Sequence, residues 1–341
     1  MTAAMPAVEP YVMALCRPAT RTIFDAQGQP DAGILDANIA VYCDLIARAA
    51  GEHGAKLIVF PQFALTGYTP LGTDGWLGAS LTFPGPEMDR IGAAARAAGA
   101  HVVIQTAERH AAFPGRYFLS AAILKPDGGI GLAYRKNYAM SLRTSPIDVF
   151  DRFVETFGPD AFLPVLDTSI GVLGVAIGAE VHWPEPIRAM ALKGAEIILN
   201  PVAAMQGIDY MNRPGAEIVR PVRAFENMVY LGMANMADGC VASQAYDFEG
   251  RAIGQAVGDG SCMTLATIDI EALRKARIFP AANFLTQIQP AIQEDARTLP
   301  LWPANAFAHL APRQFEELMA VENEVWRQMQ ALGRGTAPAT R

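Results

Sequence analysis

The first half of the chain alternates short apolar runs with stretches whose apolar residues recur at helical spacing. Residues 11–16 and 56–60 are compact apolar runs, and they predict buried strands. Residues 36–51 carry the spacing of an amphipathic helix, with Asp36 as the expected N-cap. The same criteria predict a helix over 87–98 that ends at Gly99, and strands over 102–107, 117–125 and 132–135.

The second half of the chain repeats this alternation. Strands are predicted over 172–177, 197–199, 229–234, 241–246, 252–255 and 262–268, and helices over 184–193, 214–227 and 270–276. The repeated order of strand and helix predicts a layered α/β protein. Turns such as Asp127-Gly128-Gly129 predict hairpins, so we expect mixed sheets and not purely parallel ones.

The C-terminal part of the chain has a different pattern. After Arg277 it carries five prolines before a helical stretch over 313–332. It is too apolar for a free tail, so we expect it to wrap over a surface of its own chain or of a neighbouring subunit. No linker rich in Pro, Gly or Ser separates the two halves, which predicts one domain over residues 11–278 and a C-terminal extension over 279–341.

Composition narrows the class of protein. The 341 residues are 51% hydrophobic and 18% charged, which is typical of a globular chain with a large core. A net charge of −7 provides no basic field for phosphates, so nucleic acid is not an expected partner. No apolar run approaches the roughly 20 residues that span a bilayer, and the start lacks the pattern of a secretory signal. Together with four cysteines that show no pairing motif, this predicts a cytoplasmic protein without a membrane partner.

Two segments each predict a buried strand that delivers a functional position at its end. They are residues 57–68, LIVFPQFALTGY, and residues 174–185, GVAIGAEVHWPE. With Tyr134-Arg135-Lys136 between them, they resemble the three signature segments of the nitrilase (carbon–nitrogen hydrolase) superfamily. Later runs over 188–201, 223–227 and 246–250 extend the resemblance, which covers most of residues 11–278.

The resemblance implies both a fold and a set of catalytic positions. It implies a four-layer α-β-β-α sandwich, and homodimers or larger assemblies built from dimers. The family works with a Glu, a Lys and a nucleophilic Cys. Here Gln62 stands at the Glu position, Lys136 at the Lys position and Gly178 at the Cys position.

The resemblance therefore implies an incomplete catalytic triad. In the family mechanism the Cys thiolate attacks a nitrile or amide carbon, the Glu carries the proton, and the Lys stabilises the developing charge. Gly178 has no side chain that forms a covalent adduct, and the Gln62 amide does not titrate near neutral pH. Losing such groups costs several powers of ten in rate, so hydrolysis by the thiolate route is not expected.

Lys136 beside a neutral glutamine needs another counter-charge. Three candidates are a bound anionic ligand, Glu180, and a second acid before Leu163, for which Glu155 and Asp151 are the candidate residues. Glycine at the Cys position also removes bulk and makes room for a larger group or a water molecule.

Glu180 and His182 are candidate substitutes for the missing groups. In one interpretation either of them activates a water molecule against a substrate held by Lys136. In the competing interpretation Glu180 accepts backbone hydrogen bonds, and His182 is a surface or interface side chain.

Three hypotheses for function remain open at this point. The chain is a ligand-binding or regulatory pseudoenzyme with a small, anionic ligand and an active paralogue as candidate partners. Alternatively, it runs a non-covalent reaction on a small C–N or carbonyl-containing substrate with Lys136, or it is an inactivated variant of an active enzyme. No metal-ligand spacing and no Gly-rich phosphate loop is present in the sequence, so neither a metal nor a cofactor is expected.

Overall fold

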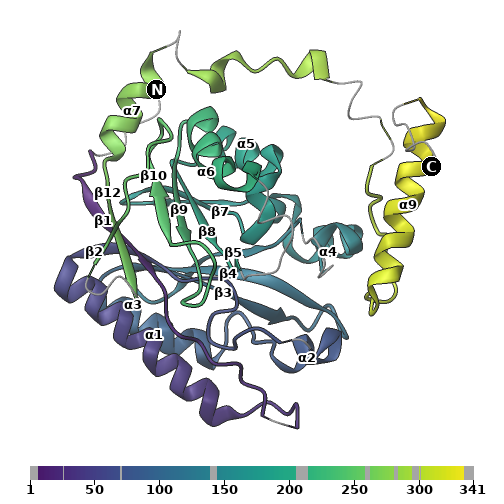
Figure 1. Ribbon diagram of the computed structural model, residues 1–341, viewed down its shortest axis with the longest axis horizontal. Helices are drawn as coiled ribbons and strands as arrows, with labels where there is room; N and C mark the ends of the chain where they lie inside the picture. The colour runs from purple at the N-terminus through teal and green to yellow at the C-terminus, as the bar shows by residue number, and fades with distance from the viewer. Residues whose placement is uncertain are drawn as a thin grey trace.

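Two β-sheets stacked face to face form the centre of the molecule, and helices cover both outer faces (Figure 1). The computed structural model describes residues 7–25, 27–69, 71–138, 144–204, 214–257, 262–279, 283–293, 299 and 301–333. The predicted four-layer α-β-β-α sandwich is confirmed by this arrangement. Among the described helices, none is both long and apolar enough to cross a bilayer.

The larger sheet has the strand order β11-β12-β1-β2-β3-β4-β5. Its strands are β1 (Tyr11–Cys16), β2 (Ala55–Val59), β3 (His101–Arg109), β4 (Tyr117–Leu124), β5 (Ile130–Arg135), β11 (Gln255–Ala256) and β12 (Met263–Ile268). Strands β1, β2 and β3 are parallel, whereas β4 is antiparallel to both β3 and β5. Strands β2 and β5 therefore run in the same direction and end at the same edge of the sheet. The predicted mixed character is confirmed.

The smaller sheet has the order β10-β9-β8-β7-β6. Its strands are β6 (Val165–Thr168), β7 (Gly171–Val175), β8 (Ile197–Pro201), β9 (Tyr230–Ala234) and β10 (Gln244–Tyr246). The three central strands β7, β8 and β9 are parallel. Their carboxyl ends meet at one edge, where loops of an α/β sheet commonly build a site.

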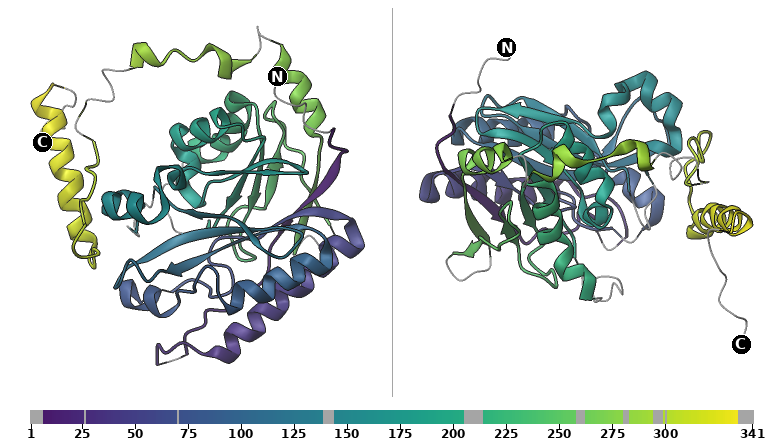
Figure 2. Two further views of the ribbon diagram at one scale, coloured as in Figure 1. Left: turned by 180° about the vertical axis from the view of Figure 1, so that it is seen from behind. Right: turned by 90° about the horizontal axis from the view of Figure 1, so that it is seen from above.

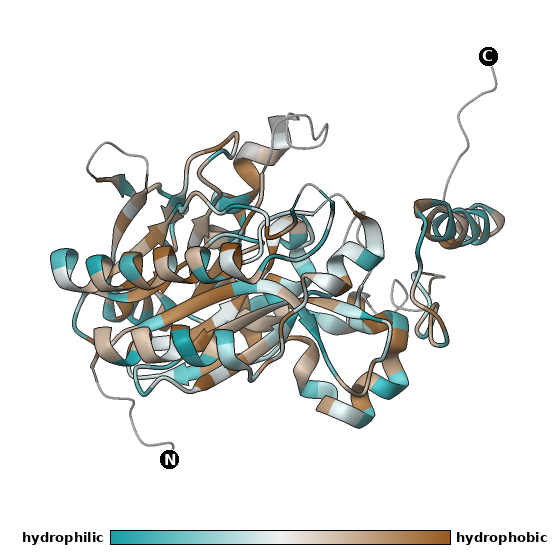
Figure 3. Cartoon of the chain, turned by 90° about the horizontal axis from the view of Figure 1, so that it is seen from below, coloured by the Kyte–Doolittle hydropathy of each residue, from teal (hydrophilic) through white to brown (hydrophobic). Residues whose placement is uncertain are grey.

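Helices pack against the outer face of each sheet. The larger sheet is covered by α1 (Ala32–His53) and α3 (Pro86–Ala98), and the smaller sheet by α5 (Pro184–Leu192) and α6 (Pro214–Asn227). Polar and apolar residues alternate along α1 and α3, as expected for helices that bury one face (Figure 3). The remaining described helices are α2 (Gly72–Gly78), α4 (Phe150–Phe157), α7 (Ile270–Ile278) and α9 (Phe315–Ala331).

Three apolar layers separate the four layers of secondary structure. Leu15, Leu57 and Leu199 belong to the layer between the sheets. The two outer layers lie between each sheet and its helices. The sheets approach so closely that a Cβ atom on Gly232 of β9 would lie 2.7 Å from Met13 Cε of β1, so a larger residue there would displace the Met13 side chain.

Helix α1 corrects one prediction about its start. The helix begins at Ala32, and the Asp31 side chain accepts hydrogen bonds from Gly33 N at 2.7 Å and Ile34 N at 3.2 Å. Asp36 lies inside the helix and pairs with Arg90 of α3, so its predicted role as N-cap is wrong. Apolar periodicity identifies the buried face of a helix, whereas the cap decides its first residue.

The C-terminal extension leaves the sandwich after α7. Residues 301–313 lie against the 3₁₀ turn η1 (Pro146–Val149) and α4. Helix α9 stands apart from the sandwich (Figure 2).

Candidate functional site

Three loops bring Gln62, Lys136 and Gly178 together at one edge of the stacked sheets. Gln62 follows β2, Lys136 directly follows β5, and Gly178 follows β7. All three residues are buried. Residues far apart in sequence meet here because strands of the same direction end at the same edge.

The geometry at Gly178 defines how close the three positions are. A Cβ atom built on Gly178 would lie 2.5 Å from Gln62 Oε1 and 3.3 Å from Lys136 Nζ. Gly178 also has a φ angle of +58°, in the left-handed region that favours glycine. The Gln62 amide thus occupies the space into which a side chain at position 178 would grow.

Asn200 and Arg220 hold the backbone of Gly178 from behind. Asn200 Nδ2 donates to Ala176 O at 2.6 Å and to Gly178 O at 3.1 Å. Arg220 Nε donates to Asn200 Oδ1 at 3.0 Å, and both side chains are buried. Sequence reasoning missed this pair as site residues. Asn200 carries the signal that identified Gln62, a polar residue at the end of a buried apolar strand.

The loop that carries Gln62 is fixed by both sheets. Gln62 N donates to Val202 O at 3.2 Å, and Phe63 N donates to the buried Gln105 side chain at 2.7 Å. Phe63 and Leu65 adopt φ angles of 61° and 67°, which are uncommon for residues with large side chains. Such a conformation persists only where surrounding contacts determine it, so the loop is a built feature of the site.

Glu180 is buried and accepts four hydrogen bonds. The donors are Tyr134 Oη at 2.6 Å, Ile177 N at 2.7 Å, Asn137 N at 2.8 Å and Tyr138 N at 3.1 Å. Burial raises the pKa of the Glu180 carboxyl, while Lys136 and the hydrogen-bond donors oppose that shift. This geometry supports the interpretation of Glu180 as an acceptor of backbone hydrogen bonds.

Glu180 is also the acid that acts on Lys136. Burial lowers the pKa of the Lys136 amine, and the charge of Glu180 partly restores it. The two other candidate acids, Asp151 and Glu155, are exposed on α4. The structure therefore brings Glu180, and not these two residues, to Lys136.

His182 ends the 3₁₀ turn η3 (Gly178–His182) and is half-buried. Its carbonyl oxygen accepts from Arg223 Nη2 at 3.3 Å. Burial, followed by the charges of Arg220 and Arg223, lowers the pKa of the imidazole. Both effects favour the neutral form of His182.

Arg135 precedes Lys136 but points its charge into a different network. Arg135 Nη2 donates to the buried Glu108 carboxylate at 2.6 Å, and Ser120 Oγ donates to the same group at 2.5 Å. The guanidinium also lies 3.8 Å from the Phe157 ring centroid. Glu108 compensates Arg135, which leaves Lys136 as the cation beside Gly178. Within the ranges that the structure describes, no group of His, Cys, Asp and Glu is arranged to hold a metal ion.

Comparisons with known proteins agree with this architecture. The model of the carbon-nitrogen hydrolase family matches residues 26–278. The chain is 31% identical to the "hydrolase in pqqF 5'region" of Pseudomonas protegens over 63% of this chain and 69% of that protein. It is 30% identical to a nitrilase of Pyrococcus abyssi, over 54% of this chain and 63% of the relative.

A solved structure shares the fold at lower sequence identity. It is a cysteine-to-alanine mutant of the amidase from Nesterenkonia sp. AN1 in complex with butyramide. The TM-score is 0.59 at 20% identity, and the match covers 84% of this chain and 96% of the amidase chain. At that identity the likeness concerns the fold alone.

Proposed function

This chain belongs to the carbon–nitrogen hydrolase family, and we propose that its pocket binds a small carbonyl-containing ligand without hydrolysing it by the thiolate route. In this proposal Gln62, Lys136 and Gly178 occupy the family's Glu, Lys and Cys positions. One observation carries it: a side chain at position 178 would begin 3.3 Å from Lys136 Nζ, and glycine supplies none. The position from which a nucleophile would attack the substrate therefore carries no nucleophilic group.

No cysteine elsewhere offers a replacement in the described parts of the chain. Cys16 is buried in the apolar layer beneath α1 and α3, and burial raises the pKa of its thiol far above the usual range. Cys43, Cys240 and Cys262 lie outside the three loops of the site. A buried thiol in apolar surroundings is inert because the thiolate is the reactive form.

The proton carrier is missing as well. The amide of Gln62 neither donates nor accepts a proton near neutral pH. Glu180 is a carboxylate, but its oxygens are already engaged by Tyr134 and three backbone amides. An acceptor held by four fixed donors stabilises the loop and is poorly placed to move a proton to a substrate.

Two observations support a small amide or carboxylate as ligand. The Nesterenkonia mutant shows that, in that amidase, a pocket with an alanine in place of a cysteine holds butyramide. Here the buried Lys136 amine lies beside a neutral Gln62, and its N–H donors favour a carbonyl or carboxylate oxygen. A glutamine in place of a glutamate removes one negative charge from the site, which favours an anion further.

The test uses the purified full chain with butyramide and butyrate as probes. We expect binding by calorimetry, no release of ammonia from butyramide, and loss of binding in Lys136→Met. Lys125→Met is the matched control, because Lys125 is an exposed turn lysine paired with Asp127. Release of ammonia that disappears in Lys136→Met, or probe binding that survives this substitution, contradicts the proposal.

A second candidate function is a non-covalent reaction on a small C–N or carbonyl-containing substrate. It is favoured by the retention of a buried Lys136, because burying an ammonium carries a desolvation cost that an inert scaffold does not need. In this case Lys136 polarises the substrate while His182 or Glu180 assists a water molecule. A product that forms with wild-type protein and not with Lys136→Met distinguishes this function from binding alone.

An inactivated variant of an active enzyme is tested by restoring both groups. The atom nearest to a Cβ at position 178 is the free end of the Gln62 side chain, which can rotate away. If Gln62→Glu with Gly178→Cys hydrolyses butyramide, the rest of the pocket still suits amidase chemistry. If it does not, the surrounding loops have diverged too.

We also propose a cytoplasmic homo-oligomer, with residues 11–278 as the domain and 279–341 as an extension that packs on it or on a neighbour. Helix α6 supports an assembly through its outer face, where Ile218, Val222 and Phe225 are exposed. An active paralogue remains a candidate partner in the regulatory version of this proposal. Light scattering of the purified chain, alone and with such a paralogue, tests both.

A further inference from the structure

The C-terminal extension contacts the loop that follows Lys136. We call residues 301–313 the strap. Asn305 N donates to Ile147 O at 2.8 Å, and Phe307 N donates to Asp148 O at 3.2 Å. The two bonds pair the strap with the backbone of η1, more than 150 residues away in sequence.

Two buried charged side chains of the main domain each form a hydrogen bond with the strap. Asp148 is fully buried and accepts from Trp302 Nε1 at 3.1 Å. Arg116 is also buried, and its Nη2 donates to Phe307 O at 2.6 Å. The charge of Asp148 acts on Arg116, where it opposes the lowering of the Arg116 pKa by burial. Each of the two buried side chains thus accepts or donates a hydrogen bond to the strap.

The strap also closes the start of helix α4. The side-chain oxygen of Asn305 accepts from Asp151 N at 3.0 Å. This backbone amide lies in the first turn of α4, where N–H groups have no partner within the helix. An asparagine from the C-terminal extension thus serves as a cap for a helix in the main domain.

A continuous series of hydrogen bonds leads from this junction to the site. Asp148 N donates to Ser145 O at 3.1 Å, and Ser145 Oγ donates to Asn137 O. Asn137 N in turn donates to the Glu180 carboxylate at 2.8 Å. Asn137 is the neighbour of Lys136 in the chain, and Glu180 is the acid that acts on it.

The far end of the strap contacts helix α2. Thr73 Oγ1 of α2 donates to Pro312 O at 3.4 Å, and Arg313 lies 3.6 Å from Asp74. This ion pair is exposed and contributes little by itself. Helix α2 nevertheless packs on the loop of Gln62, since the Trp76 and Phe63 rings lie 4.9 Å apart.

We propose that the strap is a positioning element for the site, in which Trp302 and Phe307 act through Asp148, with Asn305 holding the neighbouring backbone, to fix the segment that carries Lys136. The register of the strap against η1 is set by two backbone hydrogen bonds, from Asn305 N to Ile147 O and from Phe307 N to Asp148 O, together with the Trp302 bond to the buried Asp148 carboxylate. The inference rests on the proposed function only in that it concerns the same pocket.

The experiment measures Lys136 itself in the full-length protein. The protein is reductively methylated with formaldehyde at a series of pH values, and peptide mass spectrometry measures the methylation of Lys136. The data give the methylation rate of Lys136 and the apparent midpoint of its pH dependence. We expect Trp302→Phe and Asp148→Ala to raise the methylation rate about tenfold, because loss of one hydrogen bond shifts local opening by that order. The midpoint should move toward that of an ordinary lysine as water reaches the amine.

Rescue and control variants separate positioning from general destabilisation. Asp148→Asn keeps an oxygen for Trp302 and should retain most of the protection of Lys136. Glu271→Gln is the control, because it weakens an ion pair with Arg274 on α7 and leaves the strap intact. Thermal unfolding of each variant confirms that it is folded. If Asp148→Ala does not fold, the result with Trp302→Phe tests the positioning role.

An unchanged Lys136 rate and midpoint in folded Trp302→Phe overturns the positioning role. A change equal to that in Glu271→Gln also overturns it, because it would report only lower global stability. Failure of the wild type to bind butyramide or butyrate, together with altered Lys136 in the strap variants, removes the proposed function and leaves the positioning role standing. If the wild type binds butyramide or butyrate and the strap variants leave Lys136 unchanged, the positioning role is removed and the proposed function stands.

Discussion

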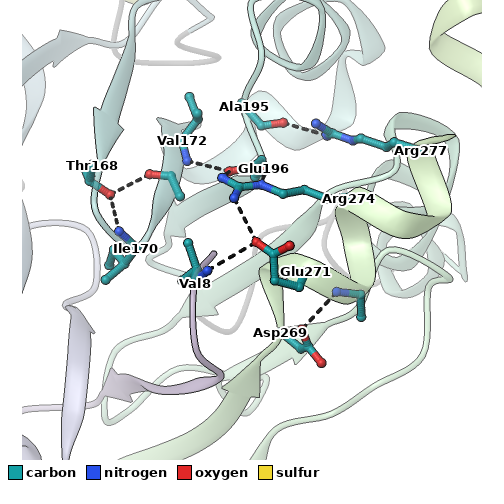
Figure 4. A network of polar contacts seen from close by, with 12 residues as sticks. Val8, Thr168, Ile170, Val172, Ala195, Glu196, Asp269, Glu271, Arg274 and Arg277 are labelled. Carbon is teal, nitrogen blue, oxygen red and sulfur yellow. Dashed lines mark hydrogen bonds and ion pairs between the residues drawn. The ribbon is translucent and has the colours of Figure 1, made fainter. Parts of the chain in front are cut away.

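The two ends of the smaller sheet bury acids in opposite ways. At the amino ends of β7 and β8, Glu196 accepts from Val172 N at 3.0 Å and from Arg274 Nε at 2.7 Å (Figure 4). Arg274 also pairs with Glu271 at 2.9 Å, and Arg277 donates to Ala195 O at 2.7 Å. Here acid and guanidinium meet directly, and their bonds tie α7 to the sheet.

At the carboxyl ends, the buried acid is satisfied by neutral donors. Glu180 accepts hydrogen bonds from a tyrosine hydroxyl and three backbone amides. Its negative charge raises the pKa of Lys136 by Coulombic attraction, without a bidentate ion pair like that of Arg274 and Glu196. Lys136 is left beside a neutral Gln62 and a glycine in the left-handed region. At the amino ends of the strands the charged side chains pair with one another, whereas at the carboxyl ends Lys136 is left to interact with a ligand.

Removing Glu180 should have the largest effect on the free energy of unfolding. In Glu180→Leu four donors lose their acceptor and Lys136 loses its counter-charge. Each unsatisfied buried donor costs about 1–3 kcal/mol, so we expect a loss of at least about 4 kcal/mol in urea unfolding. Glu180→Gln, which keeps one acceptor oxygen, is the control. A loss below about 1 kcal/mol would mean that the loops do not depend on Glu180.

Removing Glu196 should cost less and leave the pocket unaffected. Glu196→Leu strands Arg274, which retains Glu271 as a second partner. Breaking one side of a buried pair costs about 3 kcal/mol, so we expect a loss of that size or slightly less in urea unfolding. Binding of butyrate should not change in the folded variant. Altered binding would show that the two ends of the sheet are coupled.

Gly178 allows the strain and the crowding at the site to be separated. We expect Gly178→Ala to cost about 1–3 kcal/mol, because the left-handed backbone is unfavourable for alanine. Gly54 has a φ of +65° with open space where a Cβ would lie, so Gly54→Ala measures the backbone cost alone. The difference between the two should shrink by about 1 kcal/mol in a Gln62→Ala background.

Urea unfolding is measured for six proteins: the wild type, Gly178→Ala and Gly54→Ala, each with and without Gln62→Ala. No coupling between positions 62 and 178 would contradict the contact of 2.5 Å between Gln62 Oε1 and the place of a Cβ.

The smallest effect should come from two histidines, one near the site and one at the other end of the larger sheet. Burial lowers the pKa of both His182 and His101 from 6.5. The unfolded chain then binds more protons than the folded chain around pH 6.5, so the free energy of unfolding falls as the pH decreases below 6.5. Above that pH these groups contribute no slope.

Thermal unfolding of the wild type, His182→Gln and His101→Gln between pH 7.5 and 5.5 measures this effect. Each substitution should flatten the loss on acidification. Equal slopes in all three proteins would show that neither imidazole resists protonation in the folded state.

The apolar patterns of the sequence predicted most of the helices and strands, and the elements that were not predicted have physical explanations. The strand at Tyr11–Cys16 and the helices over Pro86–Ala98 and Pro214–Asn227 follow from long or compact apolar patterns. Helix α2 was missed because it contains three glycines, and β6 because its four residues are only partly buried. Such elements form because neighbouring layers supply their contacts, which a local pattern does not contain.

The sequence by itself determined the layered α/β architecture, because apolar periodicity is a local signature. It also indicated the three positions Gln62, Lys136 and Gly178, through the resemblance of three segments to those of the nitrilase superfamily. Only the tertiary structure decided that Glu180 is the acid acting on Lys136, that Asp151 and Glu155 are exposed, and that Asn200 and Arg220 hold Gly178. Those relations depend on distances between loops of different strands. Distances are fixed by the packing of the two sheets, and no single stretch of sequence records them.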